Sequence, residues 1–181
     1  MPTFGNTTGS GWVAAATSAV RGSLESSPSV DGMAQSMSVK TSNWGSGEKI
    51  TLALYDDAGN FIAATEELST GSDAGTWSQF DFVSPIAVYS STSYICCVWC
   101  DSYYNQYYDS GQPSKKYIYD ASNTYDNWPD PASVSTGTNS YAVYCTYNEG
   151  IIGGSSTPSQ KLIGTGEMST VGQGNLSFVN I

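Results

Sequence analysis

Histidine is absent from the 181 residues of the sequence. Because histidine is the most common general base and a frequent neutral metal ligand, its absence excludes Ser-His-Asp and Cys-His catalysis. Two carboxylates would suffice for a glycosidase, but the sequence holds no motif that places such a pair across a cleft. We therefore expect a protein that is not an enzyme.

Basic residues are also scarce. Six lysines and arginines stand against 16 aspartates and glutamates, which gives a formal net charge of −10. The one adjacent basic pair is Lys115 and Lys116, so a phosphate backbone would be repelled rather than bound. No apolar run approaches the length that a membrane span requires. We expect neither a nucleic-acid partner nor insertion into a membrane.

The start of the sequence lacks the features of a secretory signal. Residues 1–5, Met-Pro-Thr-Phe-Gly, have neither a basic region nor an apolar one. The composition nevertheless looks extracellular, and the Met-Pro opening resembles a natural translational start. A signal removed by processing would explain its absence, whereas a phage structural protein, which is released by lysis, would account for both observations.

Charged residues make up only 12% of the chain, and the apolar stretches are short. This pattern favours short strands joined by polar turns, so the predicted fold class is all-β. The stretch 94–100, Tyr-Ile-Cys-Cys-Val-Trp-Cys, is apolar on both faces and predicts the best-buried strand. Pro85 predicts a sheet edge or a bulge. Strands are predicted over residues 33–41, 50–55, 61–64, 77–83, 86–89, 94–100, 117–119 and 141–147, with a hairpin turn at 56–60.

The chain divides into a main domain and a tail. Residues 1–147 are predicted to form one β-sandwich domain, in which 101–140 is a long loop region rich in Tyr, Asp, Asn and Ser. Residues 148–160 have the composition of a linker, and residues 161–181 form a C-terminal arm. The arm cannot bury a core by itself, so it either adds to a sheet of a neighbouring subunit or folds back onto its own domain. The residues predicted to make this contact are Leu176, Phe178, Val179 and Ile181.

Several short motifs follow one another along residues 3–147. They are residues 3–8 (TFGNTT), 52–60 (LALYDDAGN), 64–67 (ATEE), 75–77 (GTW), 107–109 (YYD), 128–131 (WPDP) and 141–144 (YAVY). In this pattern the chain resembles a jelly-roll-like β-sandwich module of phage virion proteins, including decoration and tail proteins, and of prokaryotic surface proteins. The resemblance implies an antiparallel jelly-roll-like β-sandwich that binds carbohydrate or decorates a capsid or tail. It brings no family-wide catalytic residues, and residues 148–181 fall outside it.

The four cysteines are the first group to consider as a metal site. Cys96, Cys97 and Cys100 lie close together in the sequence, and Cys145 is distant. On a strand, Cys96 and Cys100 share one face while Cys97 points to the other, so the thiolates of a zinc site would not converge. We expect no zinc site. A disulfide between Cys145 and one of the others, and four buried free thiols, both remain open.

Aromatic and acidic residues supply the candidate binding sites. Twelve of the 13 tyrosines lie between residues 89 and 147, and an exposed tyrosine or tryptophan offers a flat apolar face and a polar tip suited to a sugar ring or a protein. The same rings are also common in packed loops. The ligand-binding candidates are Tyr103, Tyr104, Tyr107, Tyr108, Tyr125 and Trp128; the weak Ca²⁺ candidates are Asp101, Asp109, Asp120, Asp126 and Asp130.

The function expected from these features is structural. We expect a non-enzymatic structural or decorating protein of an extracellular assembly, such as a phage virion, whose partners are subunits of the same assembly in a homo-oligomer. The alternative is a carbohydrate-binding module that uses its Tyr- and Trp-rich loops. Either protein would lie outside the cell or on a virion surface, and would need no cofactor other than a structural Ca²⁺.

Overall fold

The computed structural model describes residues 1–15, 19–42, 47–69, 75–150, 167–170 and 176–179. Their regular structure consists of strands, and they include no helix that could cross a membrane. The strands are β1 (Thr3–Gly5), β2 (Gly11–Ala15), β3 (Val20–Glu25), β4 (Gly32–Ser42), β5 (Ile50–Asp56), β6 (Phe61–Ala64), β7 (Thr76–Val88), β8 (Tyr94–Cys100), β9 (Tyr104–Asp109), β10 (Lys115–Asp120), β11 (Val134–Gly137), β12 (Ser140–Tyr141), β13 (Val143–Glu149), β14 (Glu167–Thr170) and β15 (Leu176–Val179).

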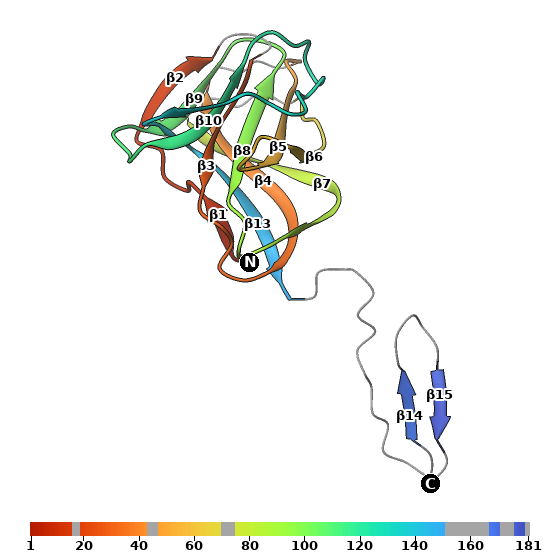
Figure 1. Ribbon diagram of the computed structural model, residues 1–181. Helices are drawn as coiled ribbons and strands as arrows, with labels where there is room; N and C mark the ends of the chain where they lie inside the picture. Colours follow the sequence, from red (N-terminus) through yellow and green to blue (C-terminus); the bar gives the residue numbers. More distant parts are fainter. Residues whose placement is uncertain (16–18, 43–46, 70–74, 151–166, 171–175, 180–181) are drawn as a thin grey trace. The chain divides into compact units, whose positions relative to one another are not determined.

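Two antiparallel sheets pack face to face, which confirms the predicted β-sandwich (Figure 1). The seven-stranded sheet has the order β1-β13-β4-β9-β12, with β7 paired to β4 and β2 paired to β9. The six-stranded sheet has the order β11-β10-β3-β8-β5-β6. Neighbours in each sheet are often far apart in the sequence, so the fold is held together by long-range pairing.

Strand β8 lies at the centre of the six-stranded sheet, and all seven of its residues are buried. Cys96 and Val98 belong to the core between the two sheets. Cys97 and Trp99 belong to a second apolar cluster on the opposite face of the same sheet. The prediction that this strand is deeply buried is confirmed, and the two clusters show that its side chains alternate between two dry environments.

The second cluster is covered by the segment between β10 and β11. Trp128 packs edge-on against Trp99 with ring centroids 5.2 Å apart, and Ala132 is buried in the same cluster. The Tyr55 hydroxyl donates a hydrogen bond to the carbonyl of Pro129 at 3.1 Å. This segment is therefore a packed flap over the six-stranded sheet.

The region predicted as a long loop, residues 101–140, contains strands β9, β10 and β11. The sequence hides β9 because two of its buried side chains, Asn105 and Gln106, are polar. The predicted closing strand over 141–147 is also divided. Tyr141 in β12 pairs with β9, whereas Val143 begins β13, which pairs with β4 and β1.

Strand β7 continues through Pro85, so the two strands predicted on either side of this residue form one. Its pairing with β4 moves from Ala34↔Ile86 to Ser36↔Asp81, which leaves residues 82–85 opposite a single residue of β4. The predicted bulge near Pro85 is confirmed, and it accommodates a residue that has no N–H to donate.

The chain forms two compact units, Met1–Gly150 and Ile151–Ile181. In the second unit β14 and β15 pair with each other in a two-stranded sheet, with Met168 opposite Phe178 and Thr170 opposite Leu176. The predicted contact residues Leu176, Phe178 and Val179 lie in β15, and Ile181 lies outside the described residues.

The four cysteines are buried free thiols, so the disulfide alternative is not the one adopted. Burial raises the pKa of each thiol, for Cys100 to about 12. Because the thiolate is the reactive form, these side chains are doubly protected, by exclusion of the reagent and by a suppressed thiolate population.

We expect the folded protein to resist alkylation by iodoacetamide near neutral pH, and the unfolded protein in concentrated guanidinium to take up four adducts. Intact-mass spectrometry counts the adducts. A Ser133→Cys variant provides the positive control, because Ser133 is exposed. Rapid labelling of a native cysteine in the folded protein would contradict the buried thiols, as would a non-reduced mass lower by the two hydrogens of a disulfide.

Candidate functional site

The candidate site begins with strand β3, whose two faces are both buried. Val20 and Leu24 contribute to the second apolar cluster. Arg21 pairs in register with Val98 of the inter-sheet core, and Ser23 pairs with Cys96. The polar residues of β3 therefore face the interior of the sandwich, where each needs a polar or charged partner.

Glu25 is the centre of a buried polar network that links the two sheets. Its carboxylate accepts hydrogen bonds from Ser23 Oγ at 2.7 Å, Ser140 Oγ at 3.1 Å and Lys115 Nζ at 3.2 Å. The backbone N–H of Tyr141 donates to Ser23 Oγ at 2.9 Å. Burial raises the pKa of Glu25, and the Ser23 hydrogen bond and the Lys115 charge oppose that rise only in part. Desolvation thus outweighs the ion pair.

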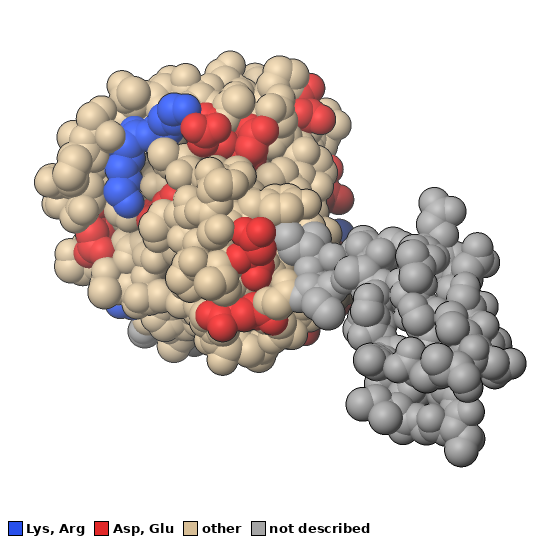
Figure 2. Space-filling view, turned by 60° about the horizontal axis from the view of Figure 1, so that its bottom comes forward, with Lys and Arg blue, Asp and Glu red and all other residues tan. Residues whose placement is uncertain are grey.

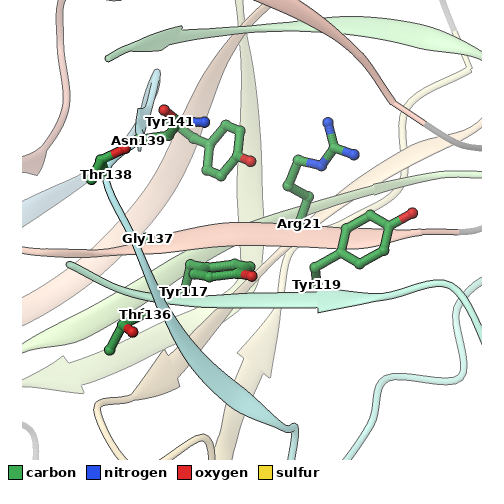
Figure 3. Close-up of a pocket in the computed structure, with 8 residues that line it drawn as sticks. All are labelled: Arg21, Tyr117, Tyr119, Thr136, Gly137, Thr138, Asn139 and Tyr141. Carbon is green, nitrogen blue, oxygen red and sulfur yellow. The ribbon is translucent and has the colours of Figure 1, made fainter. Parts of the chain in front are cut away.

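Next to this network, a pocket of about 350 Å³, here called the flank pocket, lies between β10 and β12. Tyr117 and Tyr119 project into it from β10, and Tyr141 faces them from β12, as Figure 3 shows. The residues that line the pocket are Arg21, Tyr117, Tyr119, Thr136, Gly137, Thr138, Asn139 and Tyr141. Its walls are therefore aromatic rings and its rim carries hydroxyl, amide and backbone groups.

The pocket exists because the chain changes sheets there. Strand β11 pairs with β10 in the six-stranded sheet, and β12 pairs with β9 in the seven-stranded sheet. Residues 138–139 join the two and close one side of the pocket. Gly137 allows this close approach, because a Cβ atom there would lie 3.1 Å from the ring of Tyr117.

Arg21 lies between two of the pocket tyrosines. Its guanidinium carbon is 5.1 Å from the ring centroid of Tyr119 and 5.8 Å from that of Tyr141 (Figure 3). Both distances suit cation–π attraction. Burial raises the pKa of Tyr141, and the charge of Arg21 opposes that rise. The guanidinium is thus a positive charge that two rings hold at the pocket, and Arg21 as a whole is 9% exposed.

A second hollow of about 330 Å³ lies on the other side of the Glu25 network and includes Asp109. Asp109 accepts hydrogen bonds from Thr8 Oγ1 at 2.6 Å, Ser10 N at 2.7 Å and Asn6 Nδ2 at 2.9 Å. These bonds lower the pKa of Asp109. Its oxygens are occupied in fastening the turn after β1 to the end of β9, so we assign Asp109 a structural role.

Charge is distributed unevenly over the surface. Figure 2 shows acidic side chains scattered over one face, whereas the basic side chains visible there gather mainly in one strip. Among the described residues, Lys116 pairs with Asp57 at 3.1 Å and Lys49 with Glu67 at 3.1 Å. Those two lysines are compensated locally by carboxylates.

The aromatic residues predicted to bind a ligand are dispersed, and the pocket uses none of them. Tyr104 is fully buried, and Tyr125 and Trp128 pack against the second cluster, so these three rings belong to the interior. Tyr107 lies against Lys40, with Nζ 4.7 Å from the ring centroid. Tyr108 packs on the inter-sheet core, and Tyr103 is 49% exposed but stands outside the pocket.

The predicted Ca²⁺ ligands are also dispersed, because each is used in a separate turn or strand end. Asp101 accepts a hydrogen bond from the backbone N–H of Lys49, Asp120 from that of Ser122, and Asp130 from that of Phe61. Asp109 holds the turn described above, and Asp126 adopts a positive φ of 66°. Within the described part of the chain, no three His, Cys, Asp or Glu side chains group as a metal site. The cysteines do not converge either, since Cys96 and Cys97 face opposite cores.

Sequence reasoning missed Arg21, Tyr117, Tyr119 and Tyr141 for different reasons. The two tyrosines of β10 were assigned to a short strand, and Tyr141 to a continuous strand. Strand β3 was not predicted, because its apolar positions are few. The alternation Val20-Arg21-Gly22-Ser23-Leu24-Glu25 is the one signal that could have revealed it.

The raised pKa of Glu25 predicts how stability depends on pH. The folded protein binds this proton more tightly than the unfolded chain does, so Glu25 lowers the unfolding free energy as pH rises from 4.5 through the folded pKa. Glu25→Gln lacks this titration. The unfolding free energy of the variant should therefore rise relative to wild type across that window, by about 1.4 kcal/mol for each unit of raised pKa.

Urea denaturation followed by tryptophan fluorescence, at several pH values on both sides of 4.5, measures this difference. Glu66→Gln is the matched control, because Glu66 is exposed. If the curves of wild type and Glu25→Gln run parallel with pH, the assignment of a raised pKa to Glu25 is wrong.

No protein-family model matches the chain, and no curated protein matches it. The jelly-roll-like pattern along residues 3–147 therefore remains a resemblance and assigns no family. The pocket between β10 and β12, with Arg21 and three tyrosines, is the candidate site of this fold.

Proposed function

We propose that the protein is a non-enzymatic glycan-binding module and that the flank pocket receives the sugar. The observation that carries this proposal is the pocket itself, which places Tyr117, Tyr119 and Tyr141 around a volume of about 350 Å³. That volume lies within the range of small-molecule sites. The rings offer apolar faces for the C–H surface of a pyranose, while Thr136, Thr138 and Asn139 supply hydroxyl and amide groups for its hydroxyls.

Binding without catalysis is supported by how the nearby carboxylates are used. Glu25 accepts hydrogen bonds from Ser23, Ser140 and Lys115, and Asp109 accepts several from the turn after β1. Both carboxylates hold the framework around the pocket. A hydrolase would need an acid free to donate a proton to a leaving group and a second one facing the sugar ring.

We expect Tyr119→Ala to weaken sugar binding by about fivefold or more, the effect of losing one stacked ring. Tyr119 is 44% exposed, so its truncation should leave the core unaffected. A glycan array identifies the sugars that bind, and isothermal titration calorimetry with the best of them measures the dissociation constants. Tyr103→Ala is the matched control, because this tyrosine is 49% exposed outside the pocket.

Two results would count against the proposal. One is an array on which the wild-type protein binds no saccharide. The other is a bound sugar whose affinity falls equally in the Tyr103 and Tyr119 variants, since that sugar would not occupy the pocket.

A second candidate function, supported by the C-terminal unit, is that of a structural or decorating subunit of an extracellular assembly such as a phage virion. The described part of Ile151–Ile181 contains one two-stranded sheet, β14 with β15. A lone two-stranded sheet is marginally stable in water, so a partner surface would stabilise it. The two functions are compatible, because a virion subunit that binds glycan would attach its assembly to a cell surface.

We expect the full chain to form a homo-oligomer and a chain ending at Gly150 to be monomeric and folded. Light scattering gives the mass of each, and circular dichroism checks that the shortened chain keeps its strands. Monomers from both chains would leave no support for the assembly function, and oligomers from both would place the contact in the sandwich.

A further inference from the structure

The flank pocket and the second hollow are neighbours that share a wall, residues 138–140. Thr138 and Asn139 line the flank pocket, whereas Ser140 lines the second hollow. The wall is also held from the side of the second hollow, because the backbone N–H of Gln112 donates a hydrogen bond to the carbonyl of Thr138 at 2.9 Å. The two concave surfaces therefore adjoin along one short segment of chain.

Strand β10 runs along both concave surfaces. Lys115 lines the second hollow, and Tyr117 and Tyr119 line the flank pocket. Alternate residues of a strand point to the same face and lie about 7 Å apart. The three side chains thus form one row, which leads from the second hollow into the flank pocket over a length that suits a chain of sugars better than a single sugar.

The chemistry of the second hollow differs from that of the flank pocket. The described residues that line it are polar or charged apart from one glycine. Gln112 offers an amide and Ser26, which is exposed, a hydroxyl. Lys115 Nζ donates to Glu25 and to Ser140 Oγ, each at 3.2 Å, and an ammonium group has a third donor. The second hollow is therefore suited to hydrogen-bonding hydroxyl groups rather than to stacking against a ring.

We propose that the second hollow is a further sugar subsite and that the ligand is an oligosaccharide with units in both concave surfaces. This inference rests on the proposed glycan function and specifies the length of the glycan. One unit packs on the tyrosines of the flank pocket, and another, beyond the 138–140 segment, hydrogen-bonds to Gln112, Ser26 and Lys115. The volumes, about 350 and 330 Å³, are similar, so each surface has room for a unit.

The dependence of affinity on glycan length tests this proposal. Titration calorimetry compares single sugars with their oligomers up to the pentasaccharide, in the cello-, manno-, xylo- and chito-oligosaccharide series and in any further series that the glycan array selects. We expect the longer oligomers of the best series to bind about tenfold or more tightly than the single sugar, since several hydrogen bonds are added. A single site that accepts any unit of the chain would raise the affinity by no more than the number of units.

Two variants locate the added contacts, and each is read as the ratio of oligomer affinity to single-sugar affinity on protein that circular dichroism shows to be folded. Gln112→Ala should lower this ratio by about threefold, because it removes the amide but keeps the backbone N–H that bonds Thr138. Ser26→Trp should abolish the gain, because the ring would fill the hollow. Gln79→Ala and Ser133→Trp are the matched controls, at exposed positions outside both concave surfaces.

The outcomes separate the two proposals. A gain with length that does not exceed the number of units would overturn the second subsite and leave sugar binding in the flank pocket in place. A larger gain that persists in Ser26→Trp would place the added contacts elsewhere, and this also overturns the subsite. If no saccharide of any length binds, the proposed function fails, and the inference fails with it.

Discussion

The burial of strand β3 on both faces is the constraint on which the binding region depends. Its apolar residues Val20 and Leu24 pack in the cluster beneath the flap. Because side chains alternate along a strand, Arg21, Ser23 and Glu25 must point between the sheets. Polar groups in that position cost free energy unless they are satisfied, and the partners come from the opposite sheet. Ser140 and the Tyr141 amide supply hydrogen bonds there. The network therefore fixes β12 against β3.

The pocket follows from this arrangement. A sandwich flank filled with apolar side chains would close, whereas this one carries Arg21 and the tyrosines of β10. The rings of these tyrosines border a volume of about 350 Å³ beside the guanidinium. Strand β12, although only two residues long, supplies Tyr141 as the facing wall. The Glu25 network that links the two sheets thus lies beside a concave surface that carries one positive charge.

The sequence pattern predicted those strands whose buried residues are apolar and those bounded by a recognisable turn. Strand β8 was recognised because both of its faces are apolar, and the hairpin of β5 and β6 was recognised from the turn between them. Strands β3 and β9 were missed because they have few apolar positions, and their buried residues include the polar side chains Arg21, Glu25 and Gln106. The aromatic candidates were misplaced for a related reason, since composition does not tell an exposed ring such as Tyr103 from a buried one such as Tyr104.

The sequence by itself determined the fold class, the deeply buried strand over residues 94–100 and the lack of any histidine-based chemistry, because each depends on composition or local alternation. Only the tertiary structure decided which polar residues are buried, which tyrosines share a pocket and which strands each half of the 141–147 segment pairs with. Arg21, Tyr119 and Tyr141 come from three strands, and their contacts span two sheets. Such contacts depend on strand order and register, which are properties of the whole packed chain.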